Sequence, residues 1–129
     1  MAPEIEMILM KQLSSYLAMP MFLVDVEGTL IYYNEPAEVL LGQRYDETGE
    51  MPIEVWGTAF TPTDSEGNSL ATEELPLAIA LGERRPAHGR FFITAFDGIQ
   101  HDLSVTAFPL IGQQGRYLGA VALFWEEDS

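Results

Sequence analysis

The sequence contains no cysteine. This absence excludes disulfide bonds, a thiolate nucleophile and covalent attachment of a haem through sulfur. Basic side chains are also scarce, because six Lys and Arg stand against 20 Asp and Glu and give a formal net charge of -14 at pH 7. The basic pair Arg84-Arg85 is too small to bind the phosphates of a nucleic acid, and the net charge opposes binding to anionic membranes. We therefore expect neither a nucleic acid nor a membrane as a partner.

Long apolar segments are absent too. No run approaches the ~20 apolar residues that a membrane-spanning helix needs. Glu4 and Glu6 stand where a secretory signal carries positive charge, so we expect a cytoplasmic protein. What is present, 129 residues of which 47% are hydrophobic, suits one compact domain around a single core.

The first third of the chain predicts a helix, a β-hairpin and a second helix. Apolar residues recur at helical spacing over residues 4–18, which predicts an amphipathic helix. Residues 21–26 and 29–33 read as two strands joined by a turn at Glu27-Gly28. Asn34 is suited to cap a short helix that ends at Gly42. We expect Asn34 to be structural rather than to contact a ligand.

The remainder of the chain passes from irregular structure to β-structure. Residues 43–72 are interrupted by Gly and Pro and predict at most one helical turn, at residues 53–56. Residues 72–82 predict a helix that closes at Gly82. Residues 88–96, 99–108 and 117–125 then predict three strands. The order predicts an α+β fold, with helices gathered on one face of an antiparallel sheet.

Four segments carry a resemblance to a known family: "DVEGTLIYYNEPAEVLLG", "DSEGNSLATEELPLAIALGE", "FDGIQHDLSVTAFPL" and "GRYLGAVALFWE". In this order and spacing, over residues 13–125, they resemble a PAS domain. PAS domains are sensor modules of many bacterial signalling proteins, found with the histidine kinases and phosphatases of two-component signalling. The resemblance implies a five-stranded antiparallel sheet in the order 2-1-5-4-3 and helices that enclose a cavity. It divides the chain into an N-terminal helix (1–18), a PAS domain (19–125) and an acidic tail (126–129).

The chain also departs from PAS relatives. Many of them end on an Asp-x-Thr triplet that couples the last strand to an output helix, whereas this chain ends "WEEDS". Relatives that form a flavin adduct or bind coumarate need a cysteine, and haem-binding relatives use a histidine on the helix before the third strand. Neither His88 nor His101 lies on that helix. We expect no flavin, haem or metal to co-purify, and the identity of any cofactor stays open.

No motif in the sequence predicts a metal site or a catalytic centre. Counting from Asp64 as an EF-hand loop places Ser69 where glycine is required and Leu75 where the bidentate glutamate is required. A polar turn before a helix is the better interpretation. The sequence also has no Gly-x-Ser-x-Gly elbow, no His-Glu-x-x-His motif and no phosphate-binding glycine loop. We therefore expect no enzyme activity.

Alternation along the last three strands sorts their residues into two faces. One phase holds Phe91, Ile93, Leu103, Val105, Val121 and Leu123, and the resemblance places it toward the helices and the cavity. The other phase holds Phe92, Phe96, Phe108, Leu118, Ala120 and Phe124. The predicted cavity lining is Trp56, Leu77, Leu81, Phe91, Ile93, Leu103, Val105 and Val121.

The four phenylalanines of the second phase require a cover, because burying a large apolar side chain is worth about 1.5–3 kcal/mol. The N-terminal helix and a second subunit are the candidates. We predict a homodimer joined through Ile5, Ile8, Leu9, Leu13, Tyr16, Phe92, Phe96, Phe108 and Phe124.

Three functions remain open at this point. The leading hypothesis is a sensor that binds a small apolar ligand or cofactor and passes the signal to an effector protein. The alternative is a constitutive dimerisation scaffold with a filled cavity. A small cone-shaped α+β enzyme of the isomerase kind would need a cavity carboxylate or tyrosine with a shifted pKa.

Overall fold

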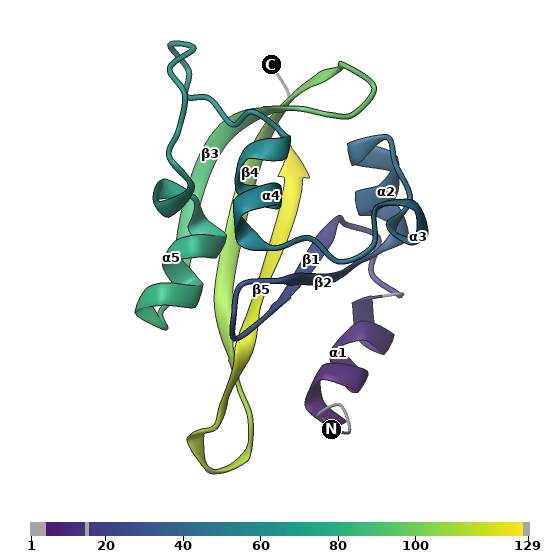
Figure 1. The fold of residues 1–129 in the computed structure, drawn as a ribbon, viewed down its shortest axis with the longest axis vertical. Coiled ribbons are helices and arrows are strands. Elements are labelled where there is room, and N and C mark those ends of the chain that lie inside the picture. The colour runs from purple at the N-terminus through teal and green to yellow at the C-terminus, as the bar shows by residue number, and fades with distance from the viewer. Residues whose placement is uncertain (1–4, 15, 128–129) are drawn as a thin grey trace.

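The computed structural model describes residues 5–14 and 16–127. Its helices and strands, in chain order, are α1 (Ile5–Ser14), β1 (Met21–Asp25), β2 (Leu30–Tyr33), α2 (Glu35–Leu41), α3 (Tyr45–Thr48), α4 (Ile53–Ala59), α5 (Pro76–Glu83), β3 (Ala87–Thr94), β4 (Gln100–Ile111) and β5 (Tyr117–Glu126). The strands form one antiparallel sheet in the order β2-β1-β5-β4-β3 (Figure 1). The predicted α+β fold and the predicted strand order are both confirmed.

Asn34 joins the first hairpin to helix α2. Its side chain is fully buried, and its Oδ1 accepts hydrogen bonds from the backbone N–H of Met21 at 3.0 Å and of Ala37 at 3.2 Å. Its Nδ2 donates to the carbonyl of Met19 at 3.0 Å. The predicted capping role is confirmed, and the same side chain also fixes the start of β1.

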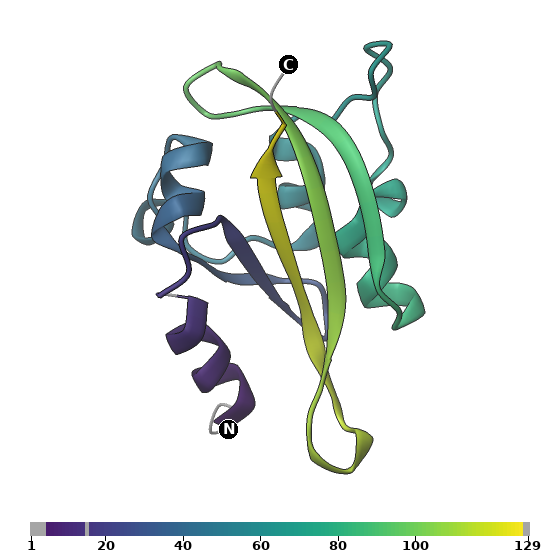
Figure 2. The same cartoon turned by 180° about the vertical axis from the view of Figure 1, so that it is seen from behind.

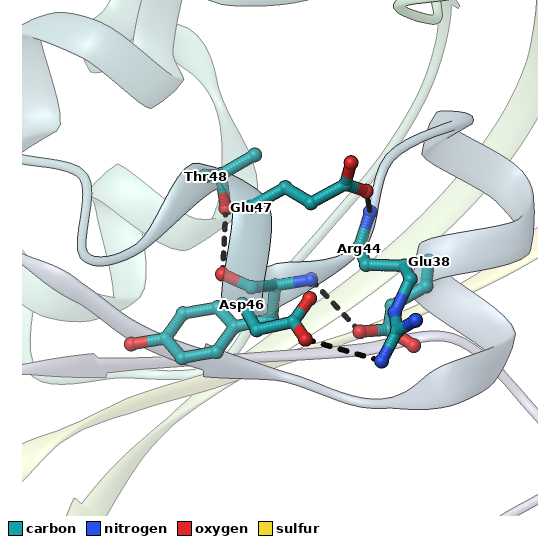
Figure 3. Close-up of polar contacts among 6 residues, drawn as sticks. Glu38, Arg44, Asp46, Glu47 and Thr48 are labelled. Atoms are coloured by element: carbon teal, nitrogen blue, oxygen red, sulfur yellow. Dashed lines mark hydrogen bonds and ion pairs between the residues drawn. The ribbon is translucent and has the colours of Figure 1, made fainter.

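Side-chain caps hold the short helix α3 against α2 (Figure 3). The backbone N–H of Tyr45 donates to Oε2 of Glu38 at 2.8 Å, and the N–H of Arg44 donates to Oε1 of Glu47 at 3.1 Å. The Arg44 guanidinium pairs with Asp46 at 3.1 Å, but both groups are exposed, so the pair adds little stability.

Residues 43–72, which were predicted to be irregular, contain more helix than their Gly and Pro content indicates. They include α3 and the seven-residue helix α4, where at most one turn was expected. Gly57 contributed to that error, because it interrupts the helical pattern. A Cβ at this position would lie 2.5 Å from the Thr72 side chain, so the glycine permits close packing rather than ending the helix.

Helix α5 extends past its predicted end. It begins at Pro76 and continues through Gly82 to Glu83, and Arg84 takes the left-handed conformation that closes it. The Arg84 guanidinium lies 4.4 Å from the centre of the Tyr117 ring, and the Tyr117 hydroxyl donates to the carbonyl of Leu81 at 2.6 Å. These contacts hold the end of α5 against the start of β5.

A bulge in β5 reverses the predicted faces of that strand. Leu110 lies opposite Gly119 and Ile111 lies opposite Tyr117, so Leu118 is an extra residue between two cross-strand pairs. The extra residue shifts the alternation by one position. The prediction for Leu118 on the outer face is therefore correct, whereas the predicted faces of the residues that follow it are wrong.

The corrected assignment follows from the clusters on either side of the sheet. We call the face that packs against α2, α4 and α5 the inner face, and the opposite one the outer face. Ala120 and Phe124 are buried on the inner face with residues such as Phe22 and Leu103, which we call the inner cluster, although they were predicted to face outward. Val121 and Leu123 pack on the outer face with Met7, Met21, Leu23 and Leu118, which we call the outer cluster, although they were predicted to face inward. Since both phases of β5 are apolar, the pattern could not reveal the shift.

Helix α1 packs against the outer face at β1 and β5. Met7 is 7% exposed and forms a cluster there with Met21, Leu23, Leu118 and Val121. Seen from behind, the sheet has no helix of the described part of the chain in front of β3 and β4 (Figure 2). The outer face is therefore only partly covered within one chain.

Candidate ligand cavity

An apolar cavity of about 50 Å³ lies between the inner face and the helices. Residues of α2, α4 and α5, of β1, β3, β4 and β5, and of the loops between them line the cavity: Phe22, Leu40, Leu41, Trp56, Phe60, Pro62, Leu75, Pro76, Leu77, Phe91, Ile93, Leu103, Val105 and Phe124. A cavity of this size exceeds the ~10–15 Å³ that one water occupies, but an apolar lining offers water no hydrogen bonds. The space therefore suits an apolar guest.

The structure brings six of the eight predicted lining residues together around this cavity: Trp56, Leu77, Phe91, Ile93, Leu103 and Val105. Leu81 packs against the inner cluster without lining the cavity. Val121 lies on the outer face, so its prediction was wrong, and the bulge at Leu118 is the physical reason.

Sequence reasoning missed the aromatic wall that β1 and β5 build. The ring centres of Phe22 and Phe124 are 4.8 Å apart in an edge-to-face contact, and the Phe22 and Phe60 centres are 6.4 Å apart. Strand β1 is apolar on both faces, with Phe22 on the inner face and Leu23 on the outer one, so alternation of polarity could not identify Phe22 as a lining residue.

The polar groups near the cavity are engaged in bracing the backbone. The indole N–H of Trp56 donates to the carbonyl of Gly28 at 2.7 Å, which fixes α4 against the first hairpin. The Tyr33 hydroxyl donates to the carbonyl of Gln43 at 3.0 Å, and burial raises the pKa of Tyr33 above its usual value. Tyr33 does not line the cavity, and none of the described residues that line it has a titratable side chain. This lining can hold an apolar molecule.

The residues predicted for a dimer interface fall into separate groups. Helix α1 docks through Met7 with the half-buried Met10, so the opposite side of the helix stays exposed. The exposed side carries Ile5, Ile8, Leu9 and Leu13, and Tyr16 just beyond the helix is exposed as well. The predicted stripe is therefore available to a partner rather than bound to its own sheet.

The four phenylalanines do not form one outer patch. Phe108 packs in the outer cluster and Phe92 is half-buried on β3. Phe96 lies beyond the end of β3, where its ring centre is 5.1 Å from that of Phe60, and Phe124 lines the cavity. The predictions for Phe96 and Phe124 on the outer face were wrong, because β3 ends at Thr94 and β5 contains the bulge.

Neither a metal site nor a membrane-spanning helix is evident in the described ranges. Residues 5–14 and 16–127 contain no group of three metal-binding side chains, and none of their helices has the length and apolar character to cross a bilayer. Oδ1 of Asp64 accepts the backbone N–H groups of Glu66 and Asn68, both at 2.9 Å. The interpretation of this segment as a polar turn is confirmed.

No family model matches the sequence. No curated protein matches it either. Among solved structures, the chain is similar to the PAS domain of BvgS from Bordetella pertussis, with a TM-score of 0.70, 17% identity, and coverage of 98% of this chain and 89% of that one.

A second similar structure is the PAS domain of nitrogen regulation protein NR(II) from Vibrio parahaemolyticus, with a TM-score of 0.64, 17% identity, and coverage of 92% and 98%. A third is the LOV protein of Rhodobacter sphaeroides, with a TM-score of 0.73, 13% identity, and coverage of 97% and 69%. The chain therefore has the PAS fold, as its sequence motifs predicted.

Proposed function

We propose that this chain is a sensor module that binds a small apolar ligand in the inner-face cavity and changes its self-association or partner contacts in response. The observation that carries the proposal is the cavity itself, a space with an entirely apolar lining in a fold that many sensor domains share. The module is not an enzyme in this proposal, and an effector protein receives its signal. A cytoplasmic location stays a prediction.

The size of the cavity favours a second candidate, a constitutive dimerisation scaffold. A volume of about 50 Å³ admits only a compact molecule without displacing the lining. In the scaffold function, the side chains that surround this space simply pack as core and no ligand enters.

Native mass spectrometry and an absorbance spectrum of the purified protein test the sensor against the scaffold. The sensor predicts a bound compound in stoichiometric amount, or thermal stabilisation by a small apolar compound. We expect no visible absorption band, since we predict no flavin or haem.

Val105→Phe should remove the binding by filling the cavity, whereas Val55→Phe, at an exposed position on α4, should preserve it. Binding that survives Val105→Phe would show that the compound sits elsewhere.

We further propose that α1 and the uncovered outer face form a homodimer. The exposed apolar side of α1 borders a groove of about 320 Å³ lined by Glu6, Leu9, Met10, Leu13, Leu110, Ile111 and Leu118. A second α1 matches the apolar character of this groove, and the contact would be symmetric.

Sedimentation equilibrium of charged variants tests the dimer. Leu9 and Leu13 are half-exposed in the single chain, so replacing both with Glu should leave folding intact and produce a monomer. The control Val39→Glu changes an exposed residue of α2 and should remain dimeric. A wild-type protein that sediments as a monomer would contradict the proposed homodimer.

A further inference from the structure

A histidine and a carboxylate form a pair on the inner face. Nδ1 of His101 on β4 is 3.2 Å from Oε2 of Glu126 on β5. The His101 side chain is 14% exposed, whereas that of Glu126 is 58% exposed. Nε2 of His101 is buried and has no hydrogen-bond partner among the described residues.

The imidazole sits directly beside the cavity lining. His101 lies opposite Ile93 in the ladder between β3 and β4, and it shares a face with Leu103 two residues along its strand. Glu126 lies opposite Leu103 and shares a face with Phe124. Ile93, Leu103 and Phe124 all line the cavity, whereas His101 and Glu126 do not, so the pair lies next to the lining on the same face of the sheet.

The contact with Glu126 determines what the unpaired nitrogen of His101 can bind. An ionised carboxylate only accepts hydrogen bonds, so Nδ1 of His101 carries the proton that faces Glu126. In the tautomer with its single proton on Nδ1, the ring presents Nε2 as an acceptor. Buried polar atoms in folded proteins almost always have a partner, and none of the residues that the structure describes supplies one here.

We propose that Nε2 of His101 is the polar anchor of the ligand site, and that the ligand is a compact apolar molecule with one N–H or O–H donor. The apolar body occupies the cavity and the donor binds Nε2, while Glu126 fixes the proton on Nδ1. This inference rests on the proposed ligand-binding function and narrows its ligand to a chemical class. An apolar molecule without a donor would leave Nε2 unpaired and bind more weakly.

Pyrrole and furan provide a matched pair of probes, because both are five-membered rings and only pyrrole has an N–H donor. We would titrate each into the full chain at pH 8 and follow the backbone amide resonances of Ile93, Leu103 and Phe124 by NMR. Pyrrole should bind the wild type about tenfold more tightly than furan, which corresponds to one hydrogen bond to a buried acceptor. His101→Leu should abolish this preference, and the control His88→Leu, at an exposed histidine of β3, should retain it.

A measurement on the wild type covers the case in which His101→Leu does not fold. The ¹⁵N resonance of Nε2 should move on addition of pyrrole and stay unchanged with furan. Equal affinities for the two probes, with no movement of this resonance, would overturn the anchor and leave the apolar cavity as a ligand site. Failure of both probes to shift any cavity resonance would overturn the proposed ligand binding and the anchor with it.

Discussion

At the scale of single residues, Asn34 makes a structural contribution that the sequence signalled. Its buried amide satisfies two backbone N–H groups and one carbonyl, at Met21, Ala37 and Met19. Asn34→Ala leaves these groups without partners in a fully buried site, so we expect a loss of about 2–4 kcal/mol of unfolding free energy. Urea denaturation measures it, with Asn68→Ala in an exposed turn as the control. Equal losses in the two variants would contradict this account of Asn34.

Gly119 shows a second residue-scale requirement, which the sequence did not signal. Its φ of 144° is unusual for other residues, and a Cβ there would lie 2.1 Å from the carbonyl oxygen of Val24. Gly119→Ala must therefore separate β1 from β5 beside the bulge, and we expect a loss of at least about 3 kcal/mol in urea denaturation.

Gly82→Ala is the matched control for Gly119→Ala. A Cβ at Gly82 meets no atom within 4 Å, and the residue lies in helix α5. Because alanine favours helix over glycine, this substitution should change stability by no more than about 1 kcal/mol, in the stabilising direction. A Gly119→Ala protein as stable as Gly82→Ala would show that the β1–β5 contact relaxes without cost.

At the scale of elements, Glu6 ties helix α1 to the loop between β4 and β5. Its Oε2 accepts from the backbone N–H of Gln113 at 3.3 Å, and its Oε1 lies 3.5 Å from the Arg116 guanidinium. Hydrogen bonds from backbone N–H groups, first its own and then that of Gln113, lower the pKa of the Glu6 carboxyl, and Arg116 adds to the effect.

The lowered pKa gives Glu6 a stabilising effect with a defined pH dependence. A carboxyl whose pKa is lower in the folded state contributes stability above its unfolded value, near 4.5, and loses it as the pH falls through the folded value. We therefore expect the wild type to exceed Glu6→Gln in stability at pH 6 and the difference to shrink below pH ~4.5. Urea denaturation of both proteins, in steps of about one pH unit from pH 3 to 7, would measure the difference in their free energies of unfolding. A difference that stays constant over this range would contradict the proposed tie.

Helix α1 as a whole covers part of the outer face, so its removal should be more severe. Deleting residues 1–17 exposes Met21, Leu23 and Val121 in addition to Phe108. We expect the shortened chain to aggregate or to change its size in gel filtration. A shortened chain that stays soluble, with the same oligomeric state and the same stability as the full chain, would show that α1 is dispensable for covering the sheet.

At the scale of the whole molecule, sequence motifs predicted the fold better than they predicted the faces of the sheet. The hairpin, Asn34 and the order of elements are local features with clear chemistry, and each was predicted correctly. The faces of β5 depend on a bulge set by cross-strand pairing, which local composition does not encode. The unpaired Nε2 of His101 likewise depends on burial by distant segments.

The central claim is that occupation of the inner cavity changes the outer face. Methyl NMR of the protein under xenon pressure tests this claim most directly, because xenon enters dry apolar cavities without chemical preference. The account predicts shifts at the cavity residues Leu103 and Val105, together with shifts at Met7 of α1 and at Leu118, which packs against it. Shifts at Leu103 and Val105 with the resonances of Met7 and Leu118 unchanged, or shifts confined to the groove beside α1, would contradict it.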